Sequence, residues 1–114
     1  MYLQKFEVKN KTALVTGAGK GIGKASAIAL AEAGADLIIL SRTVDDLNKV
    51  KKKIIELKRK CTVFKCDISN YEEVKSVFKK ISKLDILVNN AGTNRPDHFT
   101  KITKEDMDYV VDLN

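Results

Sequence analysis

The sequence predicts an α/β protein whose single parallel sheet carries helices on both faces, and three observations lead to that class. Apolar runs of strand length alternate with longer stretches that repeat apolar residues every three or four positions, which is typical of strand-helix-strand units. The runs are apolar at nearly every position, as expected for strands buried on both faces. A glycine-rich turn joins the first run to the first helical stretch. The expected fold is therefore a doubly wound parallel sheet with right-handed crossovers.

The first two strands are expected at 12–16 and 36–40, with a helix at 21–33 between them. The residues of this helix expected to face the sheet are Ile22, Ala25, Ala29 and Ala33. Small side chains on that face would let the helix and the first strand approach closely. Gly34 is expected to end the helix, because glycine readily adopts the left-handed conformation that closes a helix.

A second helix is expected at 44–58, with Thr43 as its N-cap and two acids in its first turn, where the helix dipole favours negative charge. The acids are Asp45 and Asp46, and the apolar face consists of Leu47, Val50, Ile54 and Leu57. The remaining positions are rich in lysine and are expected to form the solvated face. A third strand is expected at 61–66.

The rest of the chain continues the alternation. Ser69 or Asn70 is expected to cap a third helix, whose apolar side consists of Val74, Val77, Phe78 and Ile81. A fourth strand is expected at 84–88, then a loop at 89–100 and a helix that starts at Thr103. A sheet that stopped here would present a bare apolar edge. We therefore expect the chain to be the truncated, N-terminal four-strand portion of a longer protein.

Length and composition limit the possible functions. The 114 residues are enough for one domain, residues 1–114, with a core but without a second domain. The net charge of +6 comes from 21 Lys and Arg against 15 Asp and Glu. The densest lysine run falls on the solvated face of 44–58, so no nucleic-acid partner is expected. No apolar run approaches the ~18 residues of a membrane span, so no membrane association is expected.

Cys61 and Cys66 lie on one predicted strand. At their separation the two side chains point to opposite faces, so a disulfide between them is not expected. No second pair of cysteines or histidines accompanies them, which argues against a metal site. Small buried thiols indicate a reducing compartment, and a cytoplasmic protein is expected.

The turn after the first strand carries the chemistry of the predicted site. The residues expected to surround a ligand there are Gly17, Gly19, Lys20, Gly21, Ile22 and Gly23. At such a turn the first N–H groups of the helix point outward and the peptide dipoles add partial positive charge, which suits a pyrophosphate. Glycine is needed where a side chain would hold the phosphates off the backbone or the helix off the strand.

The spacing of these glycines departs from G-x-G-x-x-G, so the motif alone does not identify the ligand. The strand, turn and helix together predict a dinucleotide site of the Rossmann type. A glycine-rich connection without a ligand is the alternative.

The end of the second strand predicts which nicotinamide cofactor binds. A site for NAD carries an Asp or Glu there for the ribose 2′-hydroxyl, but this chain has Ser41 and Arg42. A carboxylate repels a 2′-phosphate, whereas a guanidinium binds it through two parallel hydrogen bonds. The sequence therefore predicts NADP over NAD, with Lys20 as a second positive charge. Two alternatives stay open: Arg42 could be an exposed loop residue, and Asp45 or Asp46 could turn inward.

The third and fourth strand ends also carry polar residues. Asp67 could accept a hydrogen bond from an adenine amino group, or it could cap the following helix. Asn89-Asn90-Ala91-Gly92 offers an amide and two small residues against which a ribose could lie, although such a tetrapeptide could also be an ordinary turn. In parallel sheets ligands bind at these carboxyl ends, near the point where the strand order reverses.

Taken together, these residues resemble the N-terminal half of a short-chain dehydrogenase/reductase of the shorter, non-extended branch. The resemblance is carried in order by Thr16-Gly-x-x-x-Gly-Ile-Gly23, Asp67, Asp85-Ile-Leu-Val-Asn-Asn-Ala-Gly92 and Asp112-Leu-Asn114. It covers nearly the whole chain.

The resemblance implies nicotinamide binding at the glycine turn. The residues implied to lie at the adenine are Asp67 and Ile68, and those near the ribose are Asn90, Ala91 and Gly92. Asn114 is implied to be the catalytic asparagine, which kinks its helix and holds a water in the proton relay. A full-length member is expected to be a homo-oligomer that transfers hydride between the cofactor and a carbonyl or secondary alcohol.

The pair of residues that transfers the proton in this family is missing. There, a tyrosine whose pKa is lowered by a lysine four residues later moves the proton. In the family this pair and its serine partner follow the Asn-Asn-Ala-Gly motif. Tyr71 and Lys75 have the spacing but precede that motif and enclose two glutamates, so we expect them to lie on a solvent face without a catalytic role.

Two hypotheses follow. The first is a fragment of an NADP-dependent oxidoreductase, similar to 3-oxoacyl carrier-protein reductases or sugar-acid and polyol dehydrogenases, with the 114-residue chain inactive by itself. The second is a non-catalytic chain that binds a dinucleotide as a regulator or subunit. The downstream reading frame separates them, since a Ser and a Tyr-x-x-x-Lys pair would follow only under the first.

Overall fold

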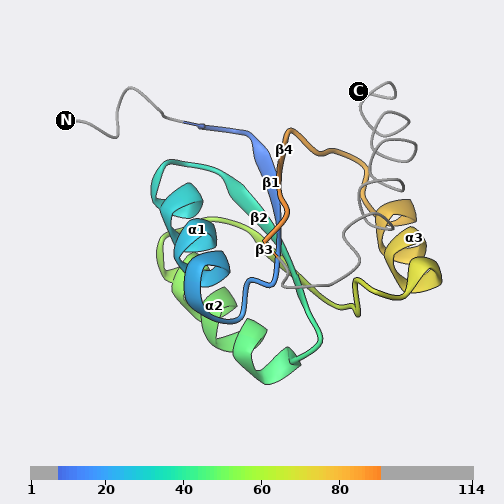
Figure 1. Cartoon of the computed structure of the whole chain (residues 1–114). Coiled ribbons are helices and arrows are strands. Elements are labelled where there is room, and N and C mark those ends of the chain that lie inside the picture. The colour runs from blue at the N-terminus through green and yellow to red at the C-terminus, as the bar shows by residue number, and fades with distance from the viewer. Residues whose placement is uncertain (1–7, 91–114) are drawn as a thin grey trace.

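The computed structural model describes residues 8–90, which form a four-stranded parallel sheet flanked by helices (Figure 1). The strands are β1 (Thr12–Thr16), β2 (Asp36–Ser41), β3 (Cys61–Lys65) and β4 (Ile86–Val88). The helices are α1 (Gly21–Glu32), α2 (Val44–Glu56) and α3 (Tyr71–Lys79). The α/β class predicted from the sequence is confirmed for these residues. The loop expected after Asn90 and the helix expected from Thr103 lie outside them.

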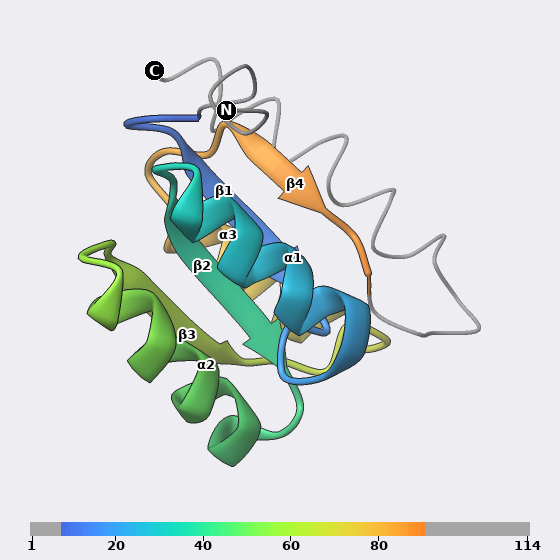
Figure 2. The same ribbon diagram turned by 90° about the vertical axis from the view of Figure 1, so that its left-hand side faces the viewer.

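The strands lie in the order β3-β2-β1-β4. All pairings are parallel, and Val15 at the centre of the sheet pairs with Ile39 on one side and Val88 on the other. The chain moves outward from β1 to β3 and then crosses back to place β4 on the other side of β1. The order therefore reverses beside β1, which is where ligands bind in open parallel sheets. Figure 2 shows the strands pointing toward the end at which α1 begins.

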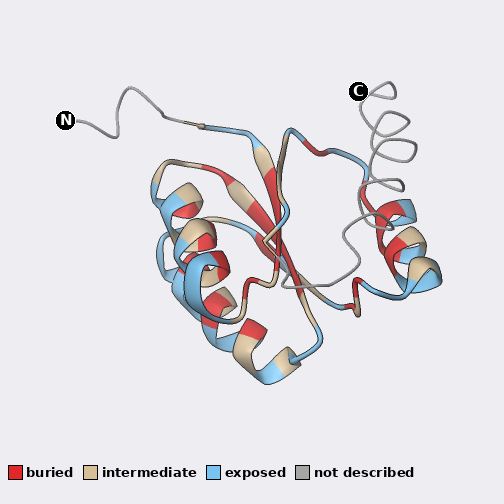
Figure 3. Ribbon diagram, in the orientation of Figure 1, coloured by how far each residue is buried: buried red, intermediate tan, exposed pale blue. Residues whose placement is uncertain are grey.

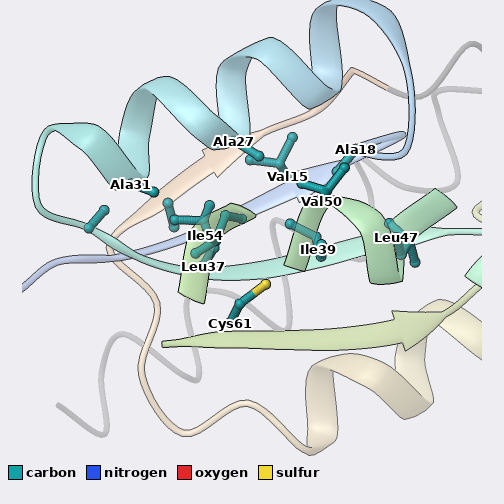
Figure 4. Packing of buried hydrophobic residues seen from close by; sticks show 12 residues of the cluster. Val15, Ala18, Ala27, Ala31, Leu37, Ile39, Leu47, Val50, Ile54 and Cys61 are labelled. Atoms are coloured by element: carbon teal, nitrogen blue, oxygen red, sulfur yellow. The ribbon is translucent and has the colours of Figure 1, made fainter. Parts of the chain in front are cut away.

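Helices α1 and α2 cover one face of the sheet and α3 covers the other (Figure 1). Successive strand residues alternate between these faces, so that Val15 packs under α1 and α2 while Leu14 packs under α3. The α1–α2 core consists of Ala13, Val15, Ala18, Ala27, Ala31, Ala35, Leu37, Ile39, Leu47, Val50, Ile54 and Cys61 (Figure 4). The α3 core consists of Leu14, Ile38, Leu40, Cys66, Ile68, Val74, Val77, Phe78, Ile81 and Leu84.

Buried residues lie along the middle of the sheet and on the helix faces turned toward it (Figure 3). In β1 and β2 most positions are buried, which explains why their sequences are apolar without alternation. The three residues of β4 are only half-buried. The lysine-rich side of α2 faces outward, as predicted, and its buried residues are Leu47, Val50 and Ile54.

The predicted inner face of α1 is wrong. The buried residues are Gly23, Ala27 and Ala31, whereas Ala25 and Ala29 are exposed and Ile22 is 75% exposed. Any face of this helix could have been taken as the inner one, because alanine occurs all around it. Gly23 decides the orientation, since it is the residue that lets α1 approach β1.

The helix ends largely follow the predictions. Gly34 adopts a φ of +107° just after the C-cap residue Ala33, as expected for a glycine that ends a helix. Leu57, predicted to lie on the apolar face of α2, is instead the C-cap residue and is exposed. Asn70 rather than Ser69 caps α3, and its side-chain oxygen accepts hydrogen bonds from the N–H groups of Glu72 and Glu73.

Cys61 and Cys66 belong to different cores, so their side chains lie on opposite faces of the sheet as predicted. Both are buried free thiols. Burial raises the pKa of each to about 11, so both remain protonated and unreactive near neutral pH.

Residues 8–90 include no helix that is both long and apolar enough to cross a membrane. Over the same part of the chain, no group of three or more His, Cys, Asp or Glu side chains is arranged to hold a metal ion.

Two helix caps provide a matched test of local stability. Replacing Asn70 with Ala removes an acceptor for two N–H groups and should lower the free energy of unfolding by about 1 kcal/mol. Replacing Thr43 with Ala should cost less, because the Thr43 side chain makes no capping hydrogen bond to α2. Urea unfolding followed by circular dichroism measures both. Equal costs would mean that the Asn70 hydrogen bonds do not stabilise α3.

Candidate functional site

The predicted site residues gather at the carboxyl edge of the sheet, beside the point where the strand order reverses. The glycine turn follows β1, Ser41 ends β2, Asp67 follows β3 and Asn89 follows β4. Four segments far apart in the sequence thus end at one edge, because all four strands are parallel. Ala91, Gly92 and Asn114 lie outside the described residues.

The glycine turn is held in a conformation that requires glycine. Gly17 and Gly21 have φ values of +61° and +56°, in the left-handed region that side chains disfavour. At Gly23 a Cβ atom would collide with the carbonyl oxygen of Gly17 and would lie 2.7 Å from Nδ2 of Asn90. At Gly21, by contrast, a Cβ would meet no atom of residues 8–90 within 4 Å. The turn therefore packs tightly on its inner side and is open on its outer side.

The beginning of α1 is prepared for an anion. Lys20 is its N-cap residue and makes no side-chain capping hydrogen bond, and the first turn contains no acid. The other two helices both carry acids in their first turns. Thus neither a side-chain cap nor an acid in the first turn of α1 compensates its first N–H groups and its helix dipole. This arrangement favours a phosphate at the start of the helix.

Thr16 joins the ends of β1 and β4. Its side chain is fully buried. The Thr16 hydroxyl donates a hydrogen bond to Oδ1 of Asn89 at 3.1 Å and accepts one from the N–H of Asn90 at 2.8 Å. This contact fixes Asn90 beside Gly23. The prediction did not assign a role to Thr16 or Asn89, because a polar residue at a strand end gives no sign of its partner on a distant strand.

The end of β2 meets the glycine turn at Gly19. A Cβ on Gly19 would lie 2.9 Å from Cβ of Asp46 and 3.7 Å from Oγ of Ser41. Asp46, in the first turn of α2, forms an ion pair with Lys20 in which Nζ and Oδ2 are 3.6 Å apart. Of the alternatives left open by the sequence, Asp46 therefore turns inward. Asp45 is exposed.

Arg42 is an exposed residue just after β2. Asp67 accepts hydrogen bonds from the N–H and the hydroxyl of Ser69, at 3.0 and 2.7 Å. These bonds, the hydroxyl first, and then the nearby positive charge of Arg42 hold the pKa of the Asp67 carboxyl below its usual range, so it is ionised at neutral pH. Asp67 does not cap α3, because Asn70 occupies that position.

Two residues differ from what their sequence positions suggest. The side chain of Ile68 is buried in the α3 core, so only its main chain is available at the carboxyl edge. Tyr71 and Lys75 were predicted to lie on a solvent face, but Tyr71 is half-buried and packs against the same core. A packing role accounts for Tyr71.

The strand order, the crossover beside β1 and the glycine turn before α1 define a fold of the Rossmann class. Comparison with known proteins then identifies the family. The family model for short chain dehydrogenase matches residues 11–114, and the chain belongs to this family.

Relatives and a solved structure agree with the assignment. The chain is 39% identical over 117 aligned positions to a 2-dehydro-3-deoxy-D-gluconate 5-dehydrogenase from Pseudoalteromonas atlantica, covering 98% of this chain and 46% of the relative. It is 35% identical to L-xylulose reductase from Mus musculus, covering 91% and 41%. It superposes with a TM-score of 0.73 and 31% identity on a metagenomic short-chain oxidoreductase in complex with NADP, covering 76% and 41%. The chain thus spans less than half the length of these relatives.

Two glycine substitutions separate crowding from backbone strain. Gly23→Ala should lower the free energy of unfolding by about 1–3 kcal/mol, because the new Cβ forces α1 away from the Gly17 carbonyl. Gly21→Ala should cost only about 1 kcal/mol, since the space is open and the cost is that of the positive φ. Chemical denaturation of the two variants measures the difference. A Gly23→Ala variant as stable as the unchanged chain would contradict the close approach.

Proposed function

We propose that the full-length protein containing this chain is an NADP-dependent oxidoreductase that transfers hydride between the nicotinamide and a carbonyl or secondary alcohol. The observation that carries this proposal is the glycine turn, which is closed toward β1 and open outward above the uncapped start of α1. Membership in the short chain dehydrogenase family supports the same chemistry. A bound nicotinamide cofactor supplies the hydride acceptor or donor.

The described residues fit the diphosphate of such a cofactor. Among the described residues no atom lies within 4 Å of a Cβ at Gly21, so they leave the main chain there open to a ligand. Gly17, Gly19, Lys20, Gly21, Ile22 and Gly23 would surround the phosphates, with the largely exposed side chain of Ile22 available to cover the ligand. Asn90, Ala91 and Gly92 would lie near the ribose, and Asp67 with the main chain of Ile68 would contact the adenine.

A preference for NADP over NAD rests on Ser41, Arg42 and Lys20. No acid occupies the last position of β2, where Ser41 stands, and Arg42 follows it. Both cations could bind a 2′-phosphate, which NAD lacks. The metagenomic relative solved in complex with NADP supports this choice without excluding NAD.

The catalytic part of the proposal rests on the family resemblance. Asn114 would hold a water in the proton relay, and a tyrosine and lysine of the full-length protein would transfer the proton. In the printed sequence Tyr71 and Lys75 alone have the required spacing, and Tyr71 packs against the α3 core. The 114-residue chain by itself is accordingly proposed to be inactive.

Substrates similar to those of the relatives, sugar acids or polyols and their ketones, are the candidates for the whole protein. The names of the gluconate dehydrogenase and the xylulose reductase support these classes. A cytoplasmic location, a homo-oligomeric full-length state and the lack of nucleic-acid and membrane partners stay predictions. The alternative of a non-catalytic dinucleotide-binding regulator requires a reading frame without the Tyr-x-x-x-Lys pair.

Cofactor binding by the full-length protein tests the proposal. The dissociation constant should be at least about tenfold lower for NADPH than for NADH, because each charge-assisted hydrogen bond to the 2′-phosphate contributes about 1.5 kcal/mol or more. Arg42→Asp should remove this preference and leave NADH binding largely unchanged. Fluorescence titration measures both constants.

Arg59→Asp provides the matched control, since Arg59 follows α2 at the opposite edge of the sheet. It should leave the ratio of the two constants unchanged. Equal affinities of the unchanged protein for both nucleotides, or tighter NADH binding, would contradict the NADP preference. No affinity for either nucleotide would contradict the proposed function itself.

A further inference from the structure

Asp46 brings a negative charge to the place where the glycine turn meets β2. Gly19 comes from the turn, Ser41 from the strand and Asp46 from the first turn of α2, and both Ser41 and Asp46 lie close to Gly19. In Rossmann folds this junction decides between the 2′-hydroxyl of NAD and the 2′-phosphate of NADP. Asp46 is five positions beyond Ser41, the last residue of β2, so a prediction of cofactor preference from the end of β2 alone does not include it.

The two partners of the Lys20–Asp46 ion pair are held very differently. The side chain of Asp46 is 21% exposed, and its Cβ packs beside Gly19 at a distance that leaves no room for another Cβ. The side chain of Lys20 is 82% exposed. Asp46 is thus held at its Cβ beside Gly19 with its side chain mostly buried, whereas the ammonium group of Lys20 reaches the carboxylate from solvent.

The ion pair is weak enough for a ligand to break. Exposed pairs contribute only about 0–1 kcal/mol, so a phosphate that offers charge-assisted hydrogen bonds competes for Lys20. When Lys20 turns to the phosphate, Asp46 keeps its position and its charge. A 2′-phosphate must then bind near an uncompensated carboxylate, whereas a 2′-hydroxyl meets no such repulsion.

We propose that Asp46 is a specificity-determining residue, whose carboxylate competes with the 2′-phosphate for Lys20 and so limits the preference for NADP over NAD. This inference rests on the proposed function, since it concerns the same nucleotide site. It assigns Asp46 a role opposite to that of Arg42.

Asp46→Asn in the full-length protein tests the inference, because the amide keeps the shape of the side chain and removes its charge. The dissociation constant for NADPH should fall about fivefold, the equivalent of about 1 kcal/mol, while that for NADH should change less than about twofold. Asp45→Asn is the matched control: it removes the same charge from the same helix turn at an exposed position. It should change neither constant by more than about twofold.

Lys20→Gln, at a largely exposed position, tests whether Asp46 affects NADPH binding through Lys20. It should weaken NADPH binding, and in its presence Asp46→Asn should improve NADPH binding less than it does with Lys20 intact. Additive effects of the two substitutions would overturn the competition for Lys20. This double-substitution cycle uses equilibrium fluorescence titration and requires no turnover.

The outcomes distinguish this inference from the proposed function. Unchanged or weaker NADPH binding by Asp46→Asn would overturn the role of Asp46, and so would an equal gain in NADPH binding from Asp45→Asn. In either case, nucleotide binding by the unchanged protein would still uphold the proposed function. Weaker NADH binding by Asp46→Asn would also overturn it, because the carboxylate would then bind the 2′-hydroxyl. Failure of the unchanged protein to bind either nucleotide would overturn both.

Discussion

The close approach of α1 to β1 is the constraint on which the rest of the structure depends. At Gly23 the helix comes so near the carbonyl oxygen of Gly17 that no side chain fits between them. This contact turns Gly23, Ala27 and Ala31 toward the sheet and leaves Ile22 largely exposed at the start of the helix. It also forces the connecting turn into left-handed conformations at Gly17 and Gly21. A turn of this shape leaves its main chain open outward, where a phosphate can reach it.

The parallel sheet brings the other predicted contacts to this turn. Because β4 lies beside β1, the buried hydroxyl of Thr16 can bond to Asn89 and Asn90 and hold Asn90 next to Gly23. Because β2 lies on the other side, Ser41 and the first turn of α2 come against Gly19. The two sides differ in charge. Amide groups line the β4 side, whereas the β2 side combines cations with the carboxylate of Asp46. We therefore propose the β2 side as the one that discriminates between nucleotides.

For residues 8–90 the sequence predicted the class of fold, the order of the elements and the edge of the sheet at which the candidate site residues gather, because apolar runs and glycines report burial and turns directly. Its prediction of the side of α1 that faces the sheet was wrong, since alanine occurs on more than one side of that helix and only the contact between Gly23 and Gly17 decides. Leu57 was placed on the apolar face by its spacing, although the helix ends there. The roles of Thr16 and Asp46 depend on neighbours from distant or adjacent elements, and spacing along the chain does not encode such contacts.

Hydrogen exchange of the full-length protein with and without saturating NADPH tests the central claim most directly. If the diphosphate binds the main chain between Gly17 and Gly23, amides of this segment should exchange more slowly when the nucleotide is bound. Amides at residues 51–56, at the far end of α2, should not change. Saturating nucleotide that leaves the exchange of the glycine turn unaltered would contradict the account.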